Sequence, residues 1–267
     1  MPRLAKVFAL LGGLAVFGIG CMVQSNSISE AVYAKLHVEP WLIGIVTAFL
    51  TGIVLIGGIK RIGQVAERIV PFMALLYIIG GSVIIAINYK EVAGAFAMIF
   101  KDAFTGTAAI SGFAGSTVAM ALRSGVTRGI FTNEAGMGSA SIAHSAACVD
   151  HPVRQGMWGT FEVFVDTILV CTITALVIIT SGLWKVPGLE GAALTSIAFE
   201  RAIRGSGVIV TISLTLFAFA TMIGWSYYGE KCLEFIFGSA LITLYRMIFI
   251  LLIVVGSVYE AKIVWGP

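Results

Sequence analysis

Long apolar runs separated by short polar stretches dominate the pattern of the chain. A helix of about 20 apolar residues crosses a bilayer, and these runs have that length without the polar face of a soluble helix. We therefore expect an all-α polytopic membrane protein with a single transmembrane domain. Its seven expected spans are 7–26, 41–57, 69–87, 116–149, 155–181, 208–228 and 240–258.

The fourth run is polar where a span should be uninterrupted. It holds Asn133 and Glu134, followed by Gly136 and Gly138. Interrupted backbone at membrane depth is tolerated only where it is buried in protein or lines a cavity, and transporters bind substrates and ions at such broken helices. We interpret 116–149 as a discontinuous helix around a binding site. Its outer half is expected at 116–131, its unwound centre at 132–138 and its inner half at 139–149.

The basic residues set the expected orientation. The stretch 58–68, which we expect to be a loop, carries three basic residues against one acidic residue. The positive-inside rule places this loop in the cytoplasm. Arg3 and Lys6 are separated from the loop by two expected membrane crossings, so they lie on the same side. We expect the chain to start on the cytoplasmic side of the cell membrane. The third span would then carry Pro71 in its first turn, where proline costs little.

Two connecting stretches are too polar to span. The stretch 89–104 has phenylalanines at i, i+4 and i+8, which predicts a helix lying in the membrane interface or packed under a loop. The stretch 182–207 is expected outside and is long enough for a short helix.

Composition agrees with a membrane protein and narrows its chemistry. Hydrophobic residues make up 58% of the chain and charged residues 12%, and the mean hydropathy is +0.99. The net charge of +3 comes without a basic run interleaved with aromatic residues, so no nucleic-acid partner is expected. The four cysteines and three histidines lack metal-ligand spacing, so we expect no metal site and no cofactor.

Asp166 is the first candidate for ion chemistry. A carboxylate inside a span costs roughly 2.5–3.5 kcal/mol on insertion scales and is by default a functional candidate. Beside it runs a polar stripe made of Thr160, Thr167, Cys171 and Thr174. The alternative to cation binding is a salt bridge with Arg123 or Arg154.

The broken stretch offers ligands for an amino acid and for a cation. Asn133 supplies donors and acceptors for a zwitterion, and the Thr132 hydroxyl with unwound carbonyls offers hard oxygen ligands to Na⁺. Glu134 either ties the broken backbone to a neighbouring helix or takes part in coupling. Arg128, expected in the outer vestibule, is a structural or gating candidate together with Glu134, Gly136 and Gly138.

Two further spans carry candidate contacts. Gly13, Gly20 and Gln24 share one helical face, so Gln24 either bonds to another helix or contacts a ligand. Thr221 and Trp225 share a face at i, i+4, and Trp225 by itself is expected to pack in the core more often than to line a site.

Residues 129–139, Gly-Ile-Phe-Thr-Asn-Glu-Ala-Gly-Met-Gly-Ser, followed by His-Pro-Val-Arg-Gln-Gly at 151–156, resemble the signature of the alanine/glycine:cation symporter family. That family belongs to the amino acid–polyamine–organocation superfamily of secondary transporters with a LeuT-like inverted-repeat fold. The resemblance implies substrate contacts from four residues: Gln24, Phe131, Asn133 and Trp225. It also implies a sodium-site hydroxyl from Thr221, next to Ala220, where the family usually has Ser.

The expected function is therefore symport of a small neutral amino acid, alanine or glycine, into the cell, coupled to Na⁺ or H⁺. For the cation we expect Thr132, Asp166 and Thr221. A channel and an intramembrane hydrolase are the alternatives, but no filter loop, charged ring or paired catalytic residues are present in the sequence.

The resemblance also predicts that part of the family's architecture is missing. Seven spans compare with about eleven, and the family's first core helix, with its Gly-x-Gly-Asn break, and its final helices have no counterpart. We expect a fragment that does not transport alone and whose partners would be the missing helices.

Overall fold

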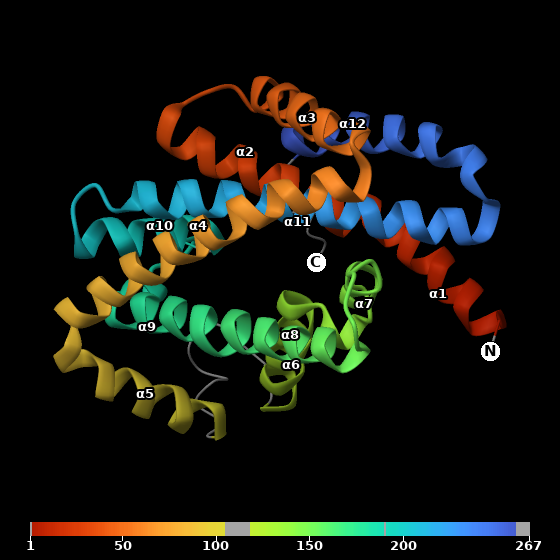
Figure 1. Cartoon of the computed structure of the whole chain (residues 1–267). Coiled ribbons are helices and arrows are strands. Elements are labelled where there is room, and N and C mark those ends of the chain that lie inside the picture. Colours follow the sequence, from red (N-terminus) through yellow and green to blue (C-terminus); the bar gives the residue numbers. More distant parts are fainter. Residues whose placement is uncertain (1, 105–117, 190, 260–267) are drawn as a thin grey trace. The chain divides into compact units, whose positions relative to one another are not determined.

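The computed structural model describes residues 2–104, 118–189 and 191–259, and this part of the chain is helical, without a strand (Figure 1). The prediction of an all-α chain is confirmed for these residues. Helices long and apolar enough to cross a membrane are Arg3–Leu36, Gly58–Ile87, Pro152–Ser181, Gly207–Phe237 and Ser239–Val258, with Pro40–Ile56 as a shorter apolar helix. The chain divides into two compact units, residues 1–76 with 208–267 and residues 77–207.

The first unit begins with one continuous helical stretch. It consists of α1 (Pro2–Ala15), the π-helical turn η1 (Val16–Met22) and α2 (Val23–Leu36). The other elements of this unit are α3 (Pro40–Ile56), the first part of α4 (Gly58–Ile87), α11 (Gly207–Phe237), the 3₁₀ turn η6 (Ser239–Leu241) and α12 (Ile242–Val258). α12 packs against α3, α2 and η1.

Small residues allow the helices of the first unit to approach closely. A Cβ on Gly256 of α12 would stand 2.6 Å from the Met22 Cα. Nearby, the Ser25 hydroxyl donates to the Ile253 carbonyl at 2.5 Å. Such contacts stabilise the packing of helices in lipid, where the hydrophobic effect contributes little to helix association.

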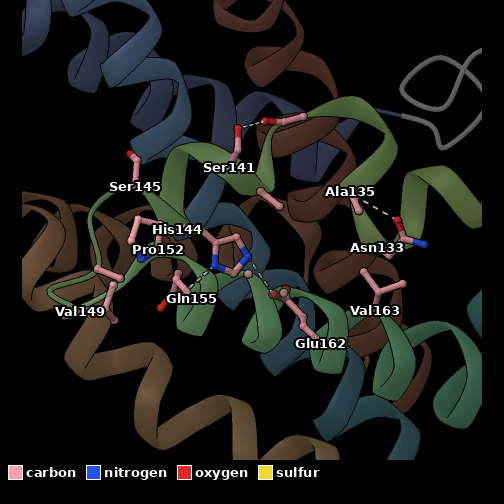
Figure 2. A pocket seen from close by; sticks show the side chains of 15 residues that line it. Asn133, Ala135, Ser141, His144, Ser145, Val149, Pro152, Gln155, Glu162 and Val163 are labelled. Carbon is pink, nitrogen blue, oxygen red and sulfur yellow. Dashed lines mark hydrogen bonds and ion pairs between the residues drawn. The ribbon is translucent and has the colours of Figure 1, made fainter.

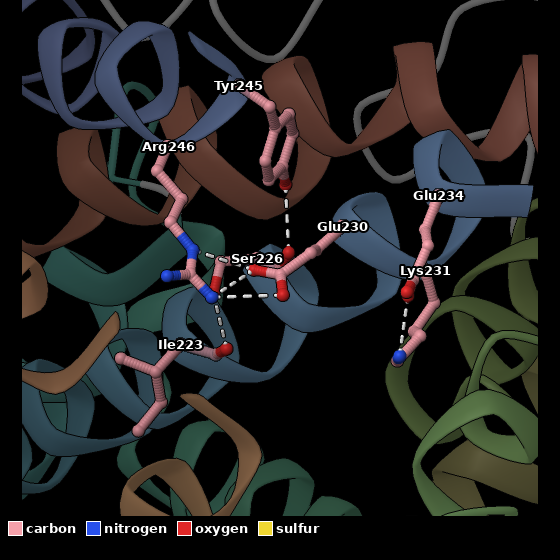
Figure 3. Close-up of polar contacts among 7 residues, drawn as sticks. All are labelled: Ile223, Ser226, Glu230, Lys231, Glu234, Tyr245 and Arg246. Carbon is pink, nitrogen blue, oxygen red and sulfur yellow. Dashed lines mark hydrogen bonds and ion pairs between the residues drawn. The ribbon is translucent and has the colours of Figure 1, made fainter. Parts of the chain in front are cut away.

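A charged pair joins α11 to α12 (Figure 3). The Arg246 guanidinium donates to both carboxylate oxygens of Glu230, at 2.8 and 2.9 Å, and the Tyr245 hydroxyl donates to the Ser226 carbonyl at 3.0 Å. Both charged side chains are half-buried, at 28% and 17% relative exposure. The bidentate geometry offsets the cost of desolvating two charges.

The second unit contains the remainder of α4 and the broken helix. Along the chain follow α5 (Tyr89–Phe104), α6 (Val118–Asn133), η3 (Ala135–Met137), α7 (Ala140–His144), α8 (Pro152–Val163), the π-helical turn η4 (Phe164–Val170), α9 (Cys171–Ser181), η5 (Leu183–Lys185) and α10 (Gly191–Ala202). The expected helices within 89–104 and 182–207 are both present. α9 packs against α5 and α10, and the Tyr77 hydroxyl of α4 lies 2.6 Å from that of Thr174.

The expected loop at 58–68 is wrong, because this stretch is the beginning of α4. The turn between α3 and α4 needs only Gly57 and Gly58. Gly58 has a φ of +61°, a left-handed conformation that costs glycine little. The Arg61 guanidinium donates to the Ile53 carbonyl near the end of α3, at 2.9 Å, and so satisfies a helix-terminal acceptor. Pro71 accordingly lies inside a long helix and not in a first turn.

Candidate functional site

The expected break in the helix is present, but it is displaced. α6 continues to Asn133, so Thr132 and Asn133 lie in its last turn and not in an unwound centre. The 3₁₀ turn η3 follows between Glu134 and Gly138, which have φ values of +56° and +78°. Left-handed backbone costs glycine little but strains a glutamate, and such strain concentrates at functional sites.

The inner half of the broken helix is shorter than expected. α7 covers only Ala140–His144, whereas we predicted 139–149. After α7 the chain tightens into turns, in which the Ala146 and Ala147 amides donate to the Ala143 and His144 carbonyls. Pro152, which lacks an amide hydrogen, then begins the next helix at a position where no donor is needed. The His151 side chain caps α8 by accepting from the Val153 amide.

Two side chains hold the break together. The Asn133 Oδ1 accepts from the Ala135 amide at 3.1 Å, and the Ser139 hydroxyl donates to the Glu134 Oε2 at 3.0 Å. Glu134 thus joins the two sides of the break. Its expected bond to a neighbouring helix stays a prediction.

The π-helical turn η4 carries Asp166 to the end of α6, against which η4 packs. The Asn133 Nδ2 donates to the Thr167 Oγ1 at 3.0 Å, and the Thr167 hydroxyl lies 3.4 Å from the Asp166 Oδ2. The Thr132 side chain also faces the Asp166 carboxylate. Three residues predicted from the sequence, Thr132, Asn133 and Asp166, therefore lie together, joined by Thr167.

This cluster presents a carboxylate, two hydroxyls and an amide. Oxygen ligands of this kind suit a hard cation such as Na⁺ or a proton at the carboxylate. Arg154, one alternative partner for Asp166, pairs instead with Asp150 at 2.9 Å. The other alternative, Arg123, is exposed.

A cavity of about 620 Å³ lies beside the cluster within the second unit. Asn133 stands at one end, and α7 and α8 form the walls with Ser141, His144, Gln155 and Glu162 (Figure 2). The cavity is several times larger than a small amino acid. Its polar side chains come from both sides of the break.

The other predicted residues of the second unit lie around the break. Phe131 is half-buried in the last turns of α6, and Arg128 is exposed. A Cβ on Gly136 would stand 2.7 Å from the Ile130 Cγ2, so glycine lets η3 fold back against α6. The structure leaves the gating roles of Gly136, Gly138 and Arg128 as predictions.

Three predicted residues belong to the first unit. Trp225 of α11 is buried, and its indole packs over Gly20 of η1, where a Cβ would stand 2.7 Å from the Trp225 Cγ. Gln24, one turn beyond Gly20, donates through Nε2 to the Ile19 carbonyl at 3.2 Å. Thr221 is half-buried one turn from Trp225. Within this unit, Gln24 and Trp225 thus both adjoin the π-helical turn.

Sequence reasoning missed two features of the site. Thr167 was expected only as part of a polar stripe, yet it bonds to Asn133; its position next to Asp166 was the available signal. Sequence reasoning did not predict the contacts of His144 with Gln155 and Glu162, because His144 lies on α7 and the other two residues lie on α8, and the three match no ligand spacing.

Comparisons with known proteins agree with this picture. A family model described as the sodium:alanine symporter family matches residues 1–266. The sodium/alanine symporter AgcS of Methanococcus maripaludis is 47% identical over 266 residues, which are 98% of this chain and 58% of that protein.

Two more distant relatives carry related names. The probable sodium/glutamine symporter GlnT of Bacillus subtilis is 37% identical, over 98% of this chain and 54% of its own length. The sodium/proton-dependent alanine carrier protein of Bacillus sp. strain PS3 is 33% identical, over 97% of this chain and 61% of its own length. The chain thus spans somewhat more than half the length of each of these relatives.

Proposed function

Since the chain belongs to the sodium:alanine symporter family, whose members are transporters rather than enzymes, we propose that it carries a small neutral amino acid into the cell together with a cation. Alanine and glycine are the proposed substrates, and Na⁺ is preferred to H⁺ as the coupling ion. The apolar helices and the family make the chain a membrane protein. We further propose the LeuT-like arrangement and a cytoplasmic start of the chain.

The contact between Asn133 and Thr167 carries this proposal. It joins the end of α6 to the π-helical turn that holds Asp166. The proposed cation ligands are Thr132, Asp166 and Thr221, and the proposed contacts of the amino acid are Gln24, Phe131, Asn133 and Trp225. Thr167 joins Asn133 of the second set to Asp166 of the first.

Coupling follows from the shared hydrogen bonds. A cation at the Asp166 carboxylate neutralises its charge and orients the Thr167 hydroxyl. The Thr167 oxygen then fixes the Asn133 amide, which leaves the Asn133 side chain ordered for the zwitterion. Because linkage is reciprocal, the bound amino acid raises the cation affinity by the same factor.

The chain covers 58% of its Methanococcus relative, so the test uses the chain alone and, where its gene encodes more residues, the longer product. Each is reconstituted into liposomes, and uptake of radiolabelled alanine is measured with and without an inward Na⁺ gradient. Saturable uptake that follows the gradient supports the proposal. Uptake that is linear in alanine and indifferent to the gradient indicates a channel. The absence of uptake from the longer product, while the Methanococcus symporter is active in parallel, contradicts the proposal.

A further inference from the structure

A second cavity lies within the second unit, where α4, α9 and α10 end. Its volume is about 270 Å³, and among the described residues it shares none with the lining of the cavity beside the broken helix. α10 packs against α9, and the Phe199 ring of α10 lies 5.5 Å from the Tyr77 ring of α4, so the three helices together form its walls. Its buried lining residues are apolar, namely Ile84, Val177 and Ala198.

This cavity lies at an edge of the membrane-spanning helices. α4 and α9 are the last parts of helical stretches long and apolar enough to cross a membrane, and both end beside the cavity. Aromatic and basic side chains follow directly. The Lys90 ammonium lies 5.9 Å from the centre of the Tyr89 ring, and that of Lys185 lies 5.2 Å from the centre of the Trp184 ring. Because such residues are typical of span ends, the cavity is expected at the depth of the phospholipid headgroups.

Arg201 is the charged residue of the described cavity lining. It is exposed, and in the part of the chain that the structure describes it has no carboxylate partner. The carboxylate of the preceding residue, Glu200, accepts from the Gly205 and Gly207 amides at 2.8 and 3.0 Å and so stabilises the turn after α10. A guanidinium without an anionic partner attracts an anion, and its planar set of donors matches the oxygens of a phosphate group.

The other polar groups of the lining mainly offer acceptors. The Thr180 and Ser181 hydroxyls each donate to a carbonyl of their own helix at 2.7 Å, so their oxygens have only lone pairs left for a ligand. The Asn88 Nδ2 donates to a carbonyl of α4 at 3.1 Å, and the Asn88 Oδ1 is a further acceptor. A ligand that suits this cavity therefore carries an anionic group for Arg201 and hydrogen-bond donors for these oxygens.

We propose that this cavity binds the headgroup of an anionic phospholipid, whose phosphate pairs with Arg201 and whose hydroxyl groups donate to Asn88 and Thr180. Phosphatidylglycerol has this chemistry, because its headgroup combines a negative phosphate with free hydroxyls and has no cationic amine. The choline headgroup has no hydrogen-bond donor and its cation would face Arg201, so phosphatidylcholine suits the cavity poorly. The site goes beyond the proposed transport function, because lipid binding can be measured whether or not the chain moves an amino acid.

The test uses the chain solubilised in detergent and measures, by native mass spectrometry, the dissociation constant of the first bound phosphatidylglycerol. Arg201→Gln should weaken this binding about fivefold, the contribution of one basic side chain to an anionic lipid. Ala202→Leu, at a lining position, fills the cavity without changing the charge and should weaken binding at least as much. Arg204→Gln is the matched control, because it removes the same charge from an exposed position outside the lining. It should change binding by less than about twofold, since a solvated charge is screened.

Two other ligands separate a lipid headgroup from other sources of phosphate. Phosphatidylcholine and free glycerol phosphate should both bind more weakly than phosphatidylglycerol. Equal losses in Arg201→Gln and Arg204→Gln would indicate a general attraction to basic residues and would overturn the proposal, as would unchanged binding in Ala202→Leu. Glycerol phosphate that binds as tightly as the lipid and depends on Arg201 would overturn the assignment to a lipid. Helix content from circular dichroism shows whether each variant is folded. A chain that fails the uptake test can still pass this one.

Discussion

Replacing Thr167 by valine should weaken the coupling between cation and amino acid. The substitution keeps the shape of the side chain but removes the hydroxyl between Asn133 and Asp166. The 3.0 Å bond from Asn133 contributes about 1 kcal/mol net. The 3.4 Å contact with Asp166 is longer than a normal hydroxyl bond, and we assign it at most about 0.5 kcal/mol. The sum corresponds to about a five- to tenfold loss in coupling.

The assay measures the alanine concentration for half-maximal uptake in proteoliposomes at low and at high Na⁺. It uses the chain alone or the longer gene product, whichever takes up alanine. In Thr167→Val, the factor by which Na⁺ lowers this concentration should fall about five- to tenfold. Thr160→Val is the control, since the Thr160 hydroxyl bonds to the Gly156 carbonyl within its own helix. The reasoning is refuted if Thr167→Val keeps this factor within about twofold, or if Thr160→Val loses as much.

Three further substitutions test the ion site and the packing around it. Asp166→Asn should raise the Na⁺ concentration for half-maximal uptake at least about tenfold, because it removes the only full charge we place at the cation. Gly20→Ala should destabilise the first unit by about 1–3 kcal/mol, measured as a lower thermal unfolding midpoint, because the added Cβ would overlap the Trp225 indole. Glu230→Gln should cost about 1–3 kcal/mol in the same measurement, because it leaves Arg246 half-buried without its anionic partner.

Each of these variants has a matched control. Asp150→Asn removes a carboxylate outside the cluster and should keep the Na⁺ dependence. Gly18→Ala lies in the same π-helical turn as Gly20 but meets no atom within 4 Å, so it should be neutral or slightly stabilising. Lys231→Met breaks an exposed pair with Glu234 and should change stability by less than about 1 kcal/mol. Equal effects in a variant and its control would contradict the corresponding explanation.

The apolar runs predicted helices well because length and composition decide whether a segment is helical in a membrane. They failed at helix ends, where local geometry decides. The residues at 58–68 are polar but helical, since a turn at Gly57 and Gly58 is enough to reverse the chain. α7 ends at His144 although the sequence stays rich in small residues, and the chain continues in turns before Pro152 begins α8.

The site was predictable where a motif marked it. Polar residues and glycines inside an apolar run located the break, and the family resemblance selected Asn133. A carboxylate inside a span, beside a stripe of hydroxyls, pointed to Asp166. Neither signal could predict that Thr167 bonds to Asn133, because that contact depends on the rotation of one helix against another.

The two π-helical turns explain why periodicity was a poor guide near the site. An i→i+5 turn inserts one residue and rotates every later side chain on its helix relative to an α-helical projection. In η4 this rotation falls between Thr160 and Cys171, so an i, i+7, i+11 stripe no longer describes one face. In η1 the Gln24 side-chain amide donates to the carbonyl of Ile19, five residues earlier in the chain. Both turns adjoin residues proposed to bind the amino acid or the cation, and hydropathy cannot reveal them, because it does not record which carbonyl each backbone amide bonds to. The geometry of the site thus depends on hydrogen bonding within single helices more than on the pattern that predicts those helices.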